Sequence, residues 1–262
     1  MDKMRKQKIL EKLDENGYIM VGTISKILGC TEVTLRRDLA VLEKEGLLKR
    51  VHGGAIKIGN NFVHKNVKDS LYVKIYEKME IAKMAYEVIE EGDTVLIDDA
   101  STSIHLGNMI MNDSSKHVTV ITNSIILAEK LLNCPHVELI VIGGETVKNL
   151  AATSGEIALQ QLNEVHAEKA FIGVNGIDFD KGITLMGYPQ CKVKKKMMSV
   201  STESYILADS DKFEKYYMSY LCDAKDVTAI LTDQEISEKI LKEATEKKIK
   251  IITKFSKTNK NQ

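Results

Sequence analysis

From residue 75 onward, short runs of β-branched and aliphatic residues recur along the chain, and stretches with helical spacing separate most of them. The runs lie at 94–97, 118–121, 137–142, 170–174, 205–208, 229–231 and 249–252. Strands that are buried on both faces have such continuous apolar runs, because the helices between them cross over the sheet and cover both faces. The pattern therefore predicts a doubly wound α/β domain.

Small polar residues follow the first four of these strands. They lie at 98–103, 122–124, 143–145 and 175–176. In an open parallel sheet, ligands bind beyond the carboxyl ends of the strands. Hydroxyl groups and backbone N–H groups at helix starts suit an anion, phosphate above all. The same residue types cap helices in any α/β protein, but four consecutive strand ends of this kind favour a small anionic ligand.

Residues 31–39, Thr-Glu-Val-Thr-Leu-Arg-Arg-Asp-Leu, have the features of a DNA-reading helix. Thr31 is a good N-cap residue. Apolar side chains recur at helical spacing at Leu35, Leu39 and Leu42. The positions on faces that need not be buried are Thr34, Arg36 and Arg37. A helix start that carries a Thr hydroxyl and two Arg side chains can enter a major groove and contact base edges and phosphates.

The flanking segments supply the rest of a winged helix-turn-helix. A first helix ends near Asn16, Thr23 caps a short second helix, and Gly29 makes the turn. Residues 47–55 alternate and break at paired glycines, as in a two-stranded wing. The tip of this wing carries Lys49, Arg50 and His52. Two arginines alone would be read as a solvated face paired with nearby acids, but the turn and the wing together favour DNA binding.

The charge balance agrees with a small DNA-binding module. The chain has 37 basic and 37 acidic residues, so nucleic acid does not cover its whole surface. Residues 1–57 nevertheless hold 12 basic and 8 acidic side chains. A surplus of this size fits a module that contacts a few phosphates.

The cysteines and histidines are scattered, which argues against a zinc site or a disulfide framework. They include Cys30, Cys134, Cys191, Cys222, His105, His117, His136 and His166. The N-terminus is charged and lacks an apolar run, and no stretch approaches the length of a membrane span. We expect a cytoplasmic protein with no metal, no cofactor and no membrane partner.

From residue 5 to residue 55 the chain resembles the winged helix-turn-helix of DeoR-type bacterial repressors. The matching positions are Arg5, Ile9, Leu13, Thr31, 34–39 and 47–55. In that family the Thr/Arg helix is the recognition helix, and the resemblance implies operator contacts for Arg36, Arg37, Arg50 and His52. The full set expected to bind DNA is Thr31, Thr34, Arg36, Arg37, Lys49, Arg50 and His52.

The resemblance continues over the α/β domain, which in DeoR-type repressors resembles sugar-phosphate isomerases and CoA-transferases. There it binds a phosphorylated sugar or related metabolite that alters DNA affinity. The matching segments are 97–98, 101–103, 122–124, 143–144, 169–177, 182–184, 193–194 and 207–213. The resemblance implies pocket roles for Asp98, Ser101, Thr102, Asn123, Lys194, Asp209 and Lys212. The strand-end argument adds Ser103, Ser124, Gly143, Gly144 and Asn175.

Four positions depart from the family pattern. Ala100 replaces a loop glycine, Asn175 an Asp, Gly187 an Asn or Asp, and Gln190 a Glu. The added methyl group and the lost charges reshape the pocket. We expect Ala100 to restrict the backbone where N–H groups approach a phosphate.

These observations predict a winged helix-turn-helix at 1–57, a linker at 58–74, and an effector-binding and oligomerisation domain at 75–262. The expected function is transcriptional regulation, as a non-enzymatic, homo-oligomeric (dimeric or tetrameric) repressor of a sugar-utilisation operon that binds operator DNA and a sugar phosphate. One alternative is an isomerase-like enzyme with an appended DNA-binding module, in which Asp178, Asp180 or Asp209 supplies the base. Another is a DNA-binding protein whose larger domain only oligomerises.

Overall fold

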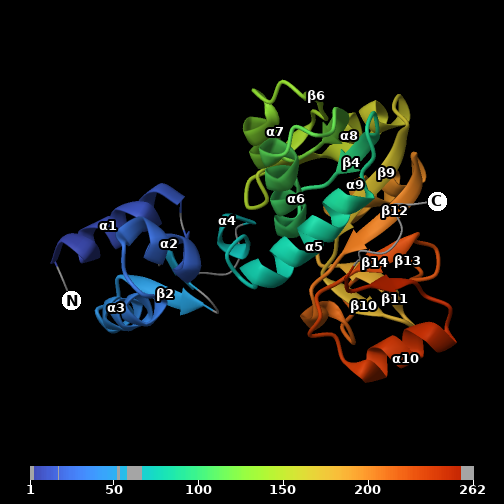
Figure 1. Cartoon of the computed structure of the whole chain (residues 1–262). Helices are drawn as coiled ribbons and strands as arrows, with labels where there is room; N and C mark the ends of the chain where they lie inside the picture. The colour runs from blue at the N-terminus through green and yellow to red at the C-terminus, as the bar shows by residue number, and fades with distance from the viewer. Residues whose placement is uncertain (1–2, 17, 52–53, 58–66, 255–262) are drawn as a thin grey trace, which may run out of the picture. The chain divides into compact units, whose positions relative to one another are not determined.

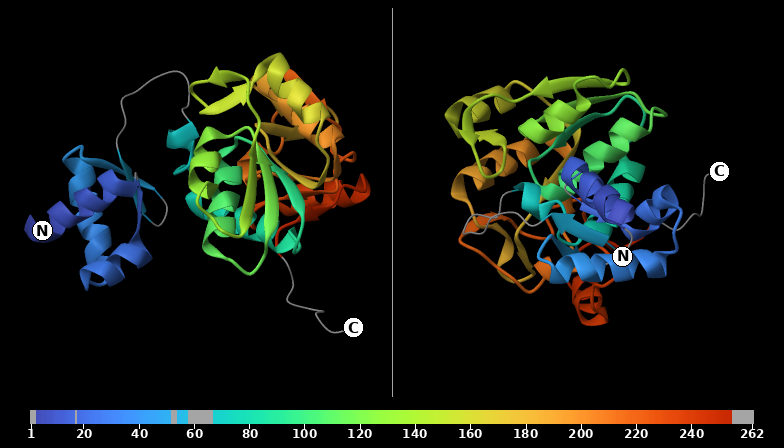
Figure 2. Two further views of the ribbon diagram at one scale, coloured as in Figure 1. Left: turned by 90° about the horizontal axis from the view of Figure 1, so that it is seen from above. Right: turned by 90° about the vertical axis from the view of Figure 1, so that its left-hand side faces the viewer.

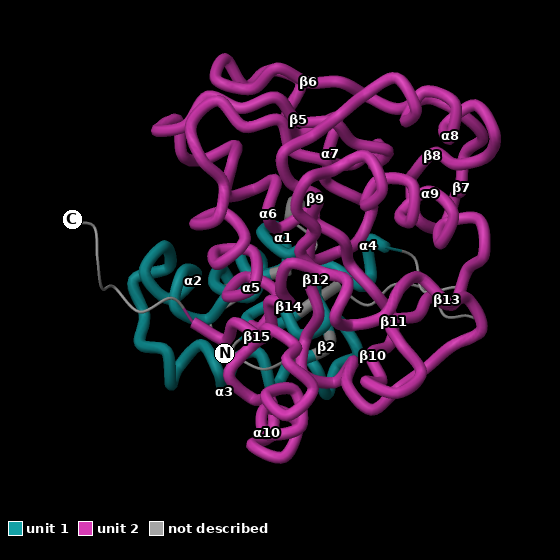
Figure 3. The backbone as a smooth tube through the Cα atoms, turned by 90° about the vertical axis from the view of Figure 1, so that its right-hand side faces the viewer, with its two compact units in different colours: residues 1–76 teal, residues 77–262 magenta. Residues whose placement is uncertain are grey.

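The computed structural model describes residues 3–16, 18–51, 54–57 and 67–254. The chain divides into two compact units, unit 1 at residues 1–76 and unit 2 at residues 77–262 (Figure 3). No helix in the described part of the chain is both long and apolar enough to cross a bilayer.

Unit 1 contains a three-helix head with a small antiparallel sheet (Figure 1). The helices of the head are α1 (Lys3–Asn16), α2 (Val21–Leu28) and α3 (Glu32–Lys44). The strands, in the order β1-β3-β2, are β1 (Tyr18–Met20), β3 (Gly54–Lys57) and β2 (Leu48–Val51). The core of the head is built from the fully buried side chains of Ile9, Leu13, Leu35, Leu39 and Leu42. The predicted helix-turn-helix and the two strands of the wing are confirmed.

The start of α2 differs from the prediction. Thr23 is not the N-cap, because α2 begins at Val21 and its N-cap is Met20, which has no side-chain capping hydrogen bond. Strand β1 ends at Met20 and runs directly into the helix, so pairing of β1 with β3 sets where the helix begins. The predicted turn is correct, since Gly29 closes α2 in the left-handed conformation at φ 62°.

A short helix, α4 (Val67–Ser70), lies in the region that the sequence predicts as a linker, and residues 58–66 of that region lie outside the described residues. Helix α5 (Ile75–Val88) follows it. The division of the chain falls within α5, after Tyr76.

Unit 2 is built on a seven-stranded parallel sheet with the order β15-β14-β12-β9-β4-β5-β6. Its strands are β4 (Thr94–Ile97), β5 (Val118–Thr122), β6 (Val137–Val141), β9 (Ala167–Gly173), β12 (Ser201–Leu207), β14 (Ala229–Leu231) and β15 (Ile251–Ile252). The helices that follow α5 are α6 (Ser101–Asn112), α7 (Ile125–Leu131), α8 (Gly155–Asn163), α9 (Tyr188–Ser199) and α10 (Glu238–Glu246).

Helices cover both faces of this sheet (Figure 2). Successive residues of β4 point to opposite faces, so Val95 and Ile97 pack with Leu106 of α6, while Leu96 belongs to the core that contains Met197 of α9. The predicted doubly wound α/β architecture is confirmed.

Two small antiparallel sheets were not predicted. The first contains β10 (Gly176–Asp178), β11 (Gly182–Leu185) and β13 (Ser219–Cys222), and the second contains β7 (Glu145–Val147) and β8 (Ala152–Ser154). Their strands have only three or four residues, too few for an alternating pattern to distinguish them from loops. They follow β6, β9 and β12 in the chain and so extend from the carboxyl edge of the large sheet.

The strand order also shows where the connections diverge at that edge. Strands β4 and β9 are neighbours, but the chain leaves β4 toward β5 and leaves β9 toward β12. The segments that follow β4 and β9 therefore diverge, which makes this a topological switch point where α/β proteins bind ligands.

Candidate DNA-binding surface and effector site

Helix α3 presents a buried face and an exposed basic face. Leu35, Asp38, Leu39 and Leu42 are buried, whereas Arg36 and Arg37 are exposed, as the sequence predicts. At the helix start, the Thr34 backbone N–H donates to Thr31 Oγ1 at 3.2 Å, and the two threonine hydroxyls lie 2.9 Å apart. The Thr31 hydroxyl thus caps the helix, and the backbone N–H and the hydroxyl of Thr34 are its two hydrogen-bond partners.

The two arginines have different surroundings. Arg36 Nη2 lies 3.3 Å from Glu32 Oε2, and both side chains are about half exposed. Arg37 makes no ion pair within the part of the chain that the structure describes. Val33 lies one turn before Arg37 on the same face and is 61% exposed. Sequence reasoning missed Val33, although its position outside the apolar stripe of α3 was a signal; an exposed Val beside an Arg can contact a thymine methyl group.

The wing is described in part. Lys49 and Arg50 lie in β2, opposite Ile56 and Ala55 of β3. The Arg50 side chain is exposed, and its backbone N–H donates to Glu43 Oε1 at 2.7 Å, which ties the wing to α3. His52 lies outside the described residues.

A partly buried ion pair fixes α3 against α1. Arg5 Nε lies 2.5 Å from Asp38 Oδ2, and the Asp38 carboxylate is almost completely buried. A second pair, Lys6 with Glu45, joins the same two helices. Arg5 therefore orients the recognition helix from behind, and only the three-dimensional structure shows that Asp38 is its partner.

At the switch point of unit 2, a buried ion pair joins the segments that follow β4 and β9. Lys194 Nζ donates to Asp98 Oδ2 at 2.6 Å and to the Gly173 carbonyl at 2.9 Å. Asp98 also accepts hydrogen bonds from the Gly173 N–H at 2.7 Å, from the Ala100 N–H at 3.0 Å, and from the Ser103 hydroxyl. We name Asp98, Lys194 and Gly173 the clasp, because they hold β4, β9 and α9 together.

Two hydrogen bonds within the clasp and an ion pair to Asp99 hold the Lys194 ammonium group. An ammonium has three N–H donors, and its oxygen neighbours here are Asp98, Gly173 and, at 3.3 Å, Asp99. Burial works against the charged form, but the two carboxylates outweigh it and hold the pKa of Lys194 above its ordinary value. This arrangement makes Lys194 a positioning residue inside the fold.

Two buried acceptor oxygens at the ends of β4 and β5 receive no hydrogen bond from the described part of the chain. They are Asp99 Oδ1, on a side chain that is 2% exposed, and Asn123 Oδ1. Asn123 Nδ2 donates to the Thr153 carbonyl at 2.9 Å, which orients its oxygen. Strands β4 and β5 are adjacent, so these two side chains follow neighbouring strand ends. Asp99 was not in the predicted site, although its place in a tandem pair of acids at a strand end was a signal.

The Asp99 carboxyl group is electrostatically unusual. Its 3.3 Å approach to Lys194 Nζ lacks hydrogen-bond geometry. Burial raises the pKa of Asp99, and the neighbouring Asp98 carboxylate adds to the effect, while Lys194 opposes it. Asp99 Oδ1 is therefore ion-paired with Lys194 but accepts no hydrogen bond of good geometry, so a donor that reached it would be favourable.

The start of α6 has no side-chain cap. Its N-cap residue, Ala100, has no side-chain oxygen, so the N–H groups in the first turn of α6 receive no hydrogen bond from an N-cap side chain. Ala100 adopts φ −72° and ψ 151°, an extended conformation that any residue accepts, so the alanine itself is not strained. Its methyl group acts through packing instead, because a Cβ on Gly173 would come within 2.1 Å of Ala100 Cβ.

The remaining predicted effector residues each have a local role at the same edge. Ser124 Oγ caps α7 through the Leu127 N–H, and Asn175 Oδ1 accepts from the Met186 N–H. Asp209 is buried after β12, and Lys212 lies partly exposed in a short turn of helix. The two strand-end glycines, Gly143 and Gly144, follow β6, where the Gly143 N–H donates to Gln161 Oε1. The structure thus brings Asp98, Ser103 and Lys194 into direct contact and leaves the others around them on neighbouring strand ends.

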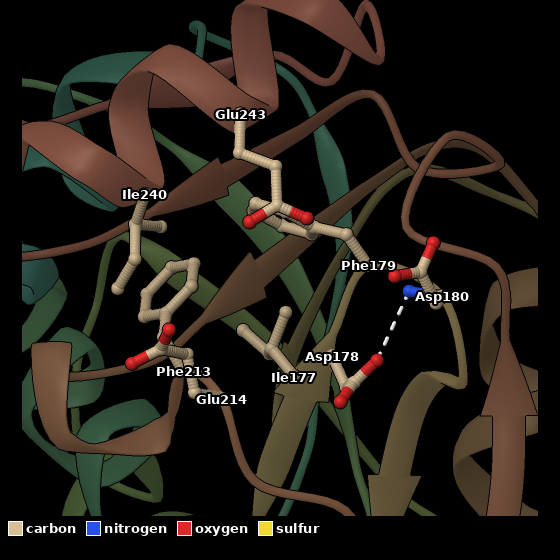
Figure 4. Close-up of a pocket in the computed structure, with 8 residues that line it drawn as sticks. All are labelled: Ile177, Asp178, Phe179, Asp180, Phe213, Glu214, Ile240 and Glu243. Carbon is tan, nitrogen blue, oxygen red and sulfur yellow. Dashed lines mark hydrogen bonds between the residues drawn. The ribbon is translucent and has the colours of Figure 1, made fainter.

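A separate pocket of about 220 Å³ lies between β10 and α10 (Figure 4). It is lined by Ile177, Asp178, Phe179, Asp180, Phe213, Glu214, Ile240 and Glu243, none of which is a predicted effector residue. Its rim carboxylates already have partners. Lys247 Nζ lies 2.5 Å from Asp180 and 3.1 Å from Glu243, and Lys239 Nζ lies 2.6 Å from Glu214. In the described part of the chain, no group of three His, Cys, Asp or Glu side chains could hold a metal ion.

Comparison with known families decides what kind of protein this is. A DeoR-like helix-turn-helix domain matches residues 5–60, and a DeoR C terminal sensor domain matches residues 73–234. The chain belongs to the DeoR family. This DeoR-family protein is therefore a DNA-binding transcriptional regulator with a C-terminal sensor domain and not an enzyme, as the sequence predicts.

Several characterised or named relatives align over nearly the whole length of this DeoR-family chain. The uncharacterised regulator YulB of Bacillus subtilis is 30% identical over 94% of this chain and 95% of its own. The lactose phosphotransferase system repressor of Lactococcus lactis is 31% identical, with 92% and 94% of the two chains covered. The putative aga operon transcriptional repressor of Escherichia coli O157:H7 is 29% identical, with 88% and 86% covered.

Among solved structures, ribose 5 phosphate isomerase A from Neisseria gonorrhoeae shares 19% identity. The match covers 57% of this chain and 56% of that one, with a TM-score of 0.39. Likeness at this level carries no argument about function.

Proposed function

We propose that this DeoR-family regulator represses a sugar-utilisation operon in the cytoplasm. In this proposal, a phosphorylated sugar or related metabolite binds unit 2 and changes how firmly the protein holds operator DNA. Relatives named as repressors of a lactose phosphotransferase system and of an aga operon support the sugar assignment. The observation that carries the effector assignment is a pair of buried oxygens, Asp99 Oδ1 and Asn123 Oδ1, which receive no hydrogen bond from the described residues and follow neighbouring strands next to the start of α6.

The chemistry of that edge suits a ligand with hydroxyl donors at one end and an anion at the other. Sugar hydroxyl groups would satisfy Asp99 Oδ1 and Asn123 Oδ1. The N–H groups at the start of α6, which receive no hydrogen bond from an N-cap side chain, and the positive end of the α6 dipole would hold a phosphate. Lys212 supplies a partly exposed cation at the same edge, since Lys194 is engaged in the clasp.

The proposed DNA contacts follow from the exposed side of the head. Arg37 lies on the exposed face of α3 and has no ion-pair partner among the described residues. It can therefore bind a guanine edge or a phosphate without first breaking an ion pair. Thr31, Thr34 and Arg36 flank it, and the wing residues Lys49, Arg50 and His52 contact the backbone in this proposal. Because helix-turn-helix proteins span half-sites about 34 Å apart, we propose that the protein acts as a homo-oligomer.

Effector binding is tested by thermal unfolding of the full chain with hexose and pentose phosphates, and with the free sugars as controls. A ligand at 100 times its Kd adds about 2.7 kcal/mol of stability. The Asp99→Ala and Asn123→Ala variants should lose the shift, and Asp180→Ala, in the separate pocket, should keep it. If no sugar phosphate shifts the wild-type transition, the effector assignment is wrong and the alternative of a purely oligomerising larger unit is favoured.

Control of DNA binding is tested by titrating the active sugar phosphate with and without operator DNA. If the effector weakens DNA binding, operator DNA must weaken effector binding by the same factor, typically worth about 1–3 kcal/mol. Equal effector affinities in the two titrations would exclude allosteric control.

A further inference from the structure

The two edges of the large parallel sheet are different. The β15 edge has two residues, Ile251 and Ile252, which is short enough to discourage pairing with another strand. The β6 edge has five, Val-Glu-Leu-Ile-Val, with one charge and neither Lys nor Pro. Figure 3 shows β6 at the outer margin of unit 2. Proteins usually protect such edges with charge, proline, bulges or short strands, and β6 has only Glu138.

The hydrogen-bond pattern shows which backbone groups of β6 point outward. Val118 N–H donates to the His136 carbonyl, and Ile142 N–H donates to the Thr122 carbonyl. Since alternate residues of a strand face the same neighbour, Glu138 and Ile140 face β5 while Leu139 and Val141 direct their N–H and C=O groups away from the sheet. The Val137 N–H is the exception, because it donates to the Cys134 carbonyl and only its C=O remains available.

The side chains along the same edge are apolar and exposed. Ile140 is 40% exposed and Val141 is 47% exposed, on opposite faces of the sheet. Ile125 of α7, at 43% exposure, also lies toward the carboxyl end of the strands. An edge with free backbone groups and exposed apolar side chains on both faces can accept another strand.

We propose that a second copy of this chain pairs with β6, antiparallel about a two-fold axis at Leu139. This inference deepens the proposed homo-oligomer by naming its interface. Under this symmetry Leu139 faces the partner's Leu139, and each donates its N–H to the other's C=O. The Val141 N–H then donates to the C=O of the partner's Val137. This pairing needs only the carbonyl of Val137, whose N–H already donates to the Cys134 carbonyl. The outward groups of the strand therefore complement their own copy, and the two sheets join into one.

The register also fixes the side-chain pairs. Ile140 lies directly opposite Glu138 of the partner subunit, at a narrow pair where Cα atoms are about 4.5 Å apart. Each contact occurs twice in the dimer. A charged side chain introduced at position 140 would therefore lie opposite the carboxylate of the partner's Glu138.

This pairing is tested by sedimentation of the full chain over a range of concentrations. We expect Ile140→Glu to raise the dimer dissociation constant by about tenfold, because like charges oppose each other twice, and Ile140→Lys to leave it unchanged or lower it. Met218→Glu, at an exposed site just before β13 in a different sheet, is the control and should behave as wild type. Equal behaviour of the Glu and Lys variants, a monomeric wild type, or dissociation by Met218→Glu would each overturn the proposal.

Amide hydrogen exchange on the wild-type protein gives a second test that needs no variant. The Leu139 and Val141 amides should gain protection as concentration rises, while the Glu138 and Ile140 amides, bonded to β5, stay protected throughout. Concentration-independent exchange at Leu139 and Val141 would contradict the pairing. Neither experiment uses DNA or a sugar phosphate, so failure of the proposed operator or effector leaves both results interpretable.

Discussion

Lys194 Nζ and Asp98 Oδ2 lie 2.6 Å apart, and both side chains are buried where β4, β9 and α9 meet. The backbone of Gly173 bonds to both, since its N–H donates to Asp98 and its C=O accepts from Lys194. A buried charge without a partner is far more costly than a paired one. The proposed effector site is therefore built on a charged pair that first serves the fold.

Removing the Lys194 ammonium should destabilise unit 2. Lys194→Met leaves Asp98 and Asp99 buried without their cation, and we expect the free energy of unfolding in urea to fall by about 3–5 kcal/mol. Lys195→Met, on the exposed face of the same helix, should change it little. Equal stability of the two variants would mean that the clasp does not support the fold.

The Asp99 carboxyl group should give the protein a pH-dependent stability. Its pKa is raised by burial above the value of about 3.9 in an unfolded chain. Between those two values the folded state holds a proton that the unfolded state has lost, so the contribution of this group falls as pH rises through that window. Asp99→Asn should remove the decline, so the stability of the variant relative to wild type should improve from about pH 4 upward. Parallel stability profiles for the two proteins would contradict the raised pKa.

The close contact between Gly173 and Ala100 predicts that a substitution at one position can offset the destabilising effect of a substitution at the other. A methyl group on Gly173 would lie 2.1 Å from Ala100 Cβ, and its other neighbours are at 3.7 Å or more. We expect Gly173→Ala to lower the free energy of unfolding by about 1–3 kcal/mol through overpacking. Adding Ala100→Gly should recover most of the loss, which a double-mutant cycle measures. Simple additivity would show that the strain arises elsewhere.

The two arginines of α3 should contribute unequally to operator binding. Arg37 has no ion-pair partner among the described residues, whereas Arg36 pairs with Glu32. We expect Arg37→Ala to cost about 1–3 kcal/mol of binding free energy and Arg36→Ala less. The double variant should abolish operator binding and keep its thermal response to sugar phosphate. Loss of both properties together would show that these arginines support the fold.

The pair between Arg5 and Asp38 should matter for the head alone. Arg5→Ala leaves the Asp38 carboxylate buried without its partner, and we expect the head to lose about 1–3 kcal/mol of stability. Lys6→Ala removes a more exposed pair between the same helices and should cost less. Amide exchange in α1 and α3 measures both effects, and equal losses would contradict a special role for Arg5.

Local sequence determined the elements of this protein. The Thr31 cap, the apolar spacing of Leu35, Leu39 and Leu42, and the left-handed turn at Gly29 each depend on residues within one or two helical turns. The apolar runs of the larger unit likewise indicated the parallel strands and their covering helices. Such features depend on residues that are close in the sequence, so they can be predicted without knowing the tertiary structure.

Tertiary structure decided the contacts between distant segments. Asp98 and Lys194 are 96 residues apart in the sequence. Only the order of the strands brings them together, so that Lys194 forms its buried ion pair with Asp98. The same order places Asp99 and Asn123 after adjacent strands, and the pairing of β1 with β3 moves the start of α2 away from Thr23. Residue type and spacing showed which side chains could gather at the sheet edge, but which of them face a ligand depends on strand order and burial, because those set the partners that each polar atom finds.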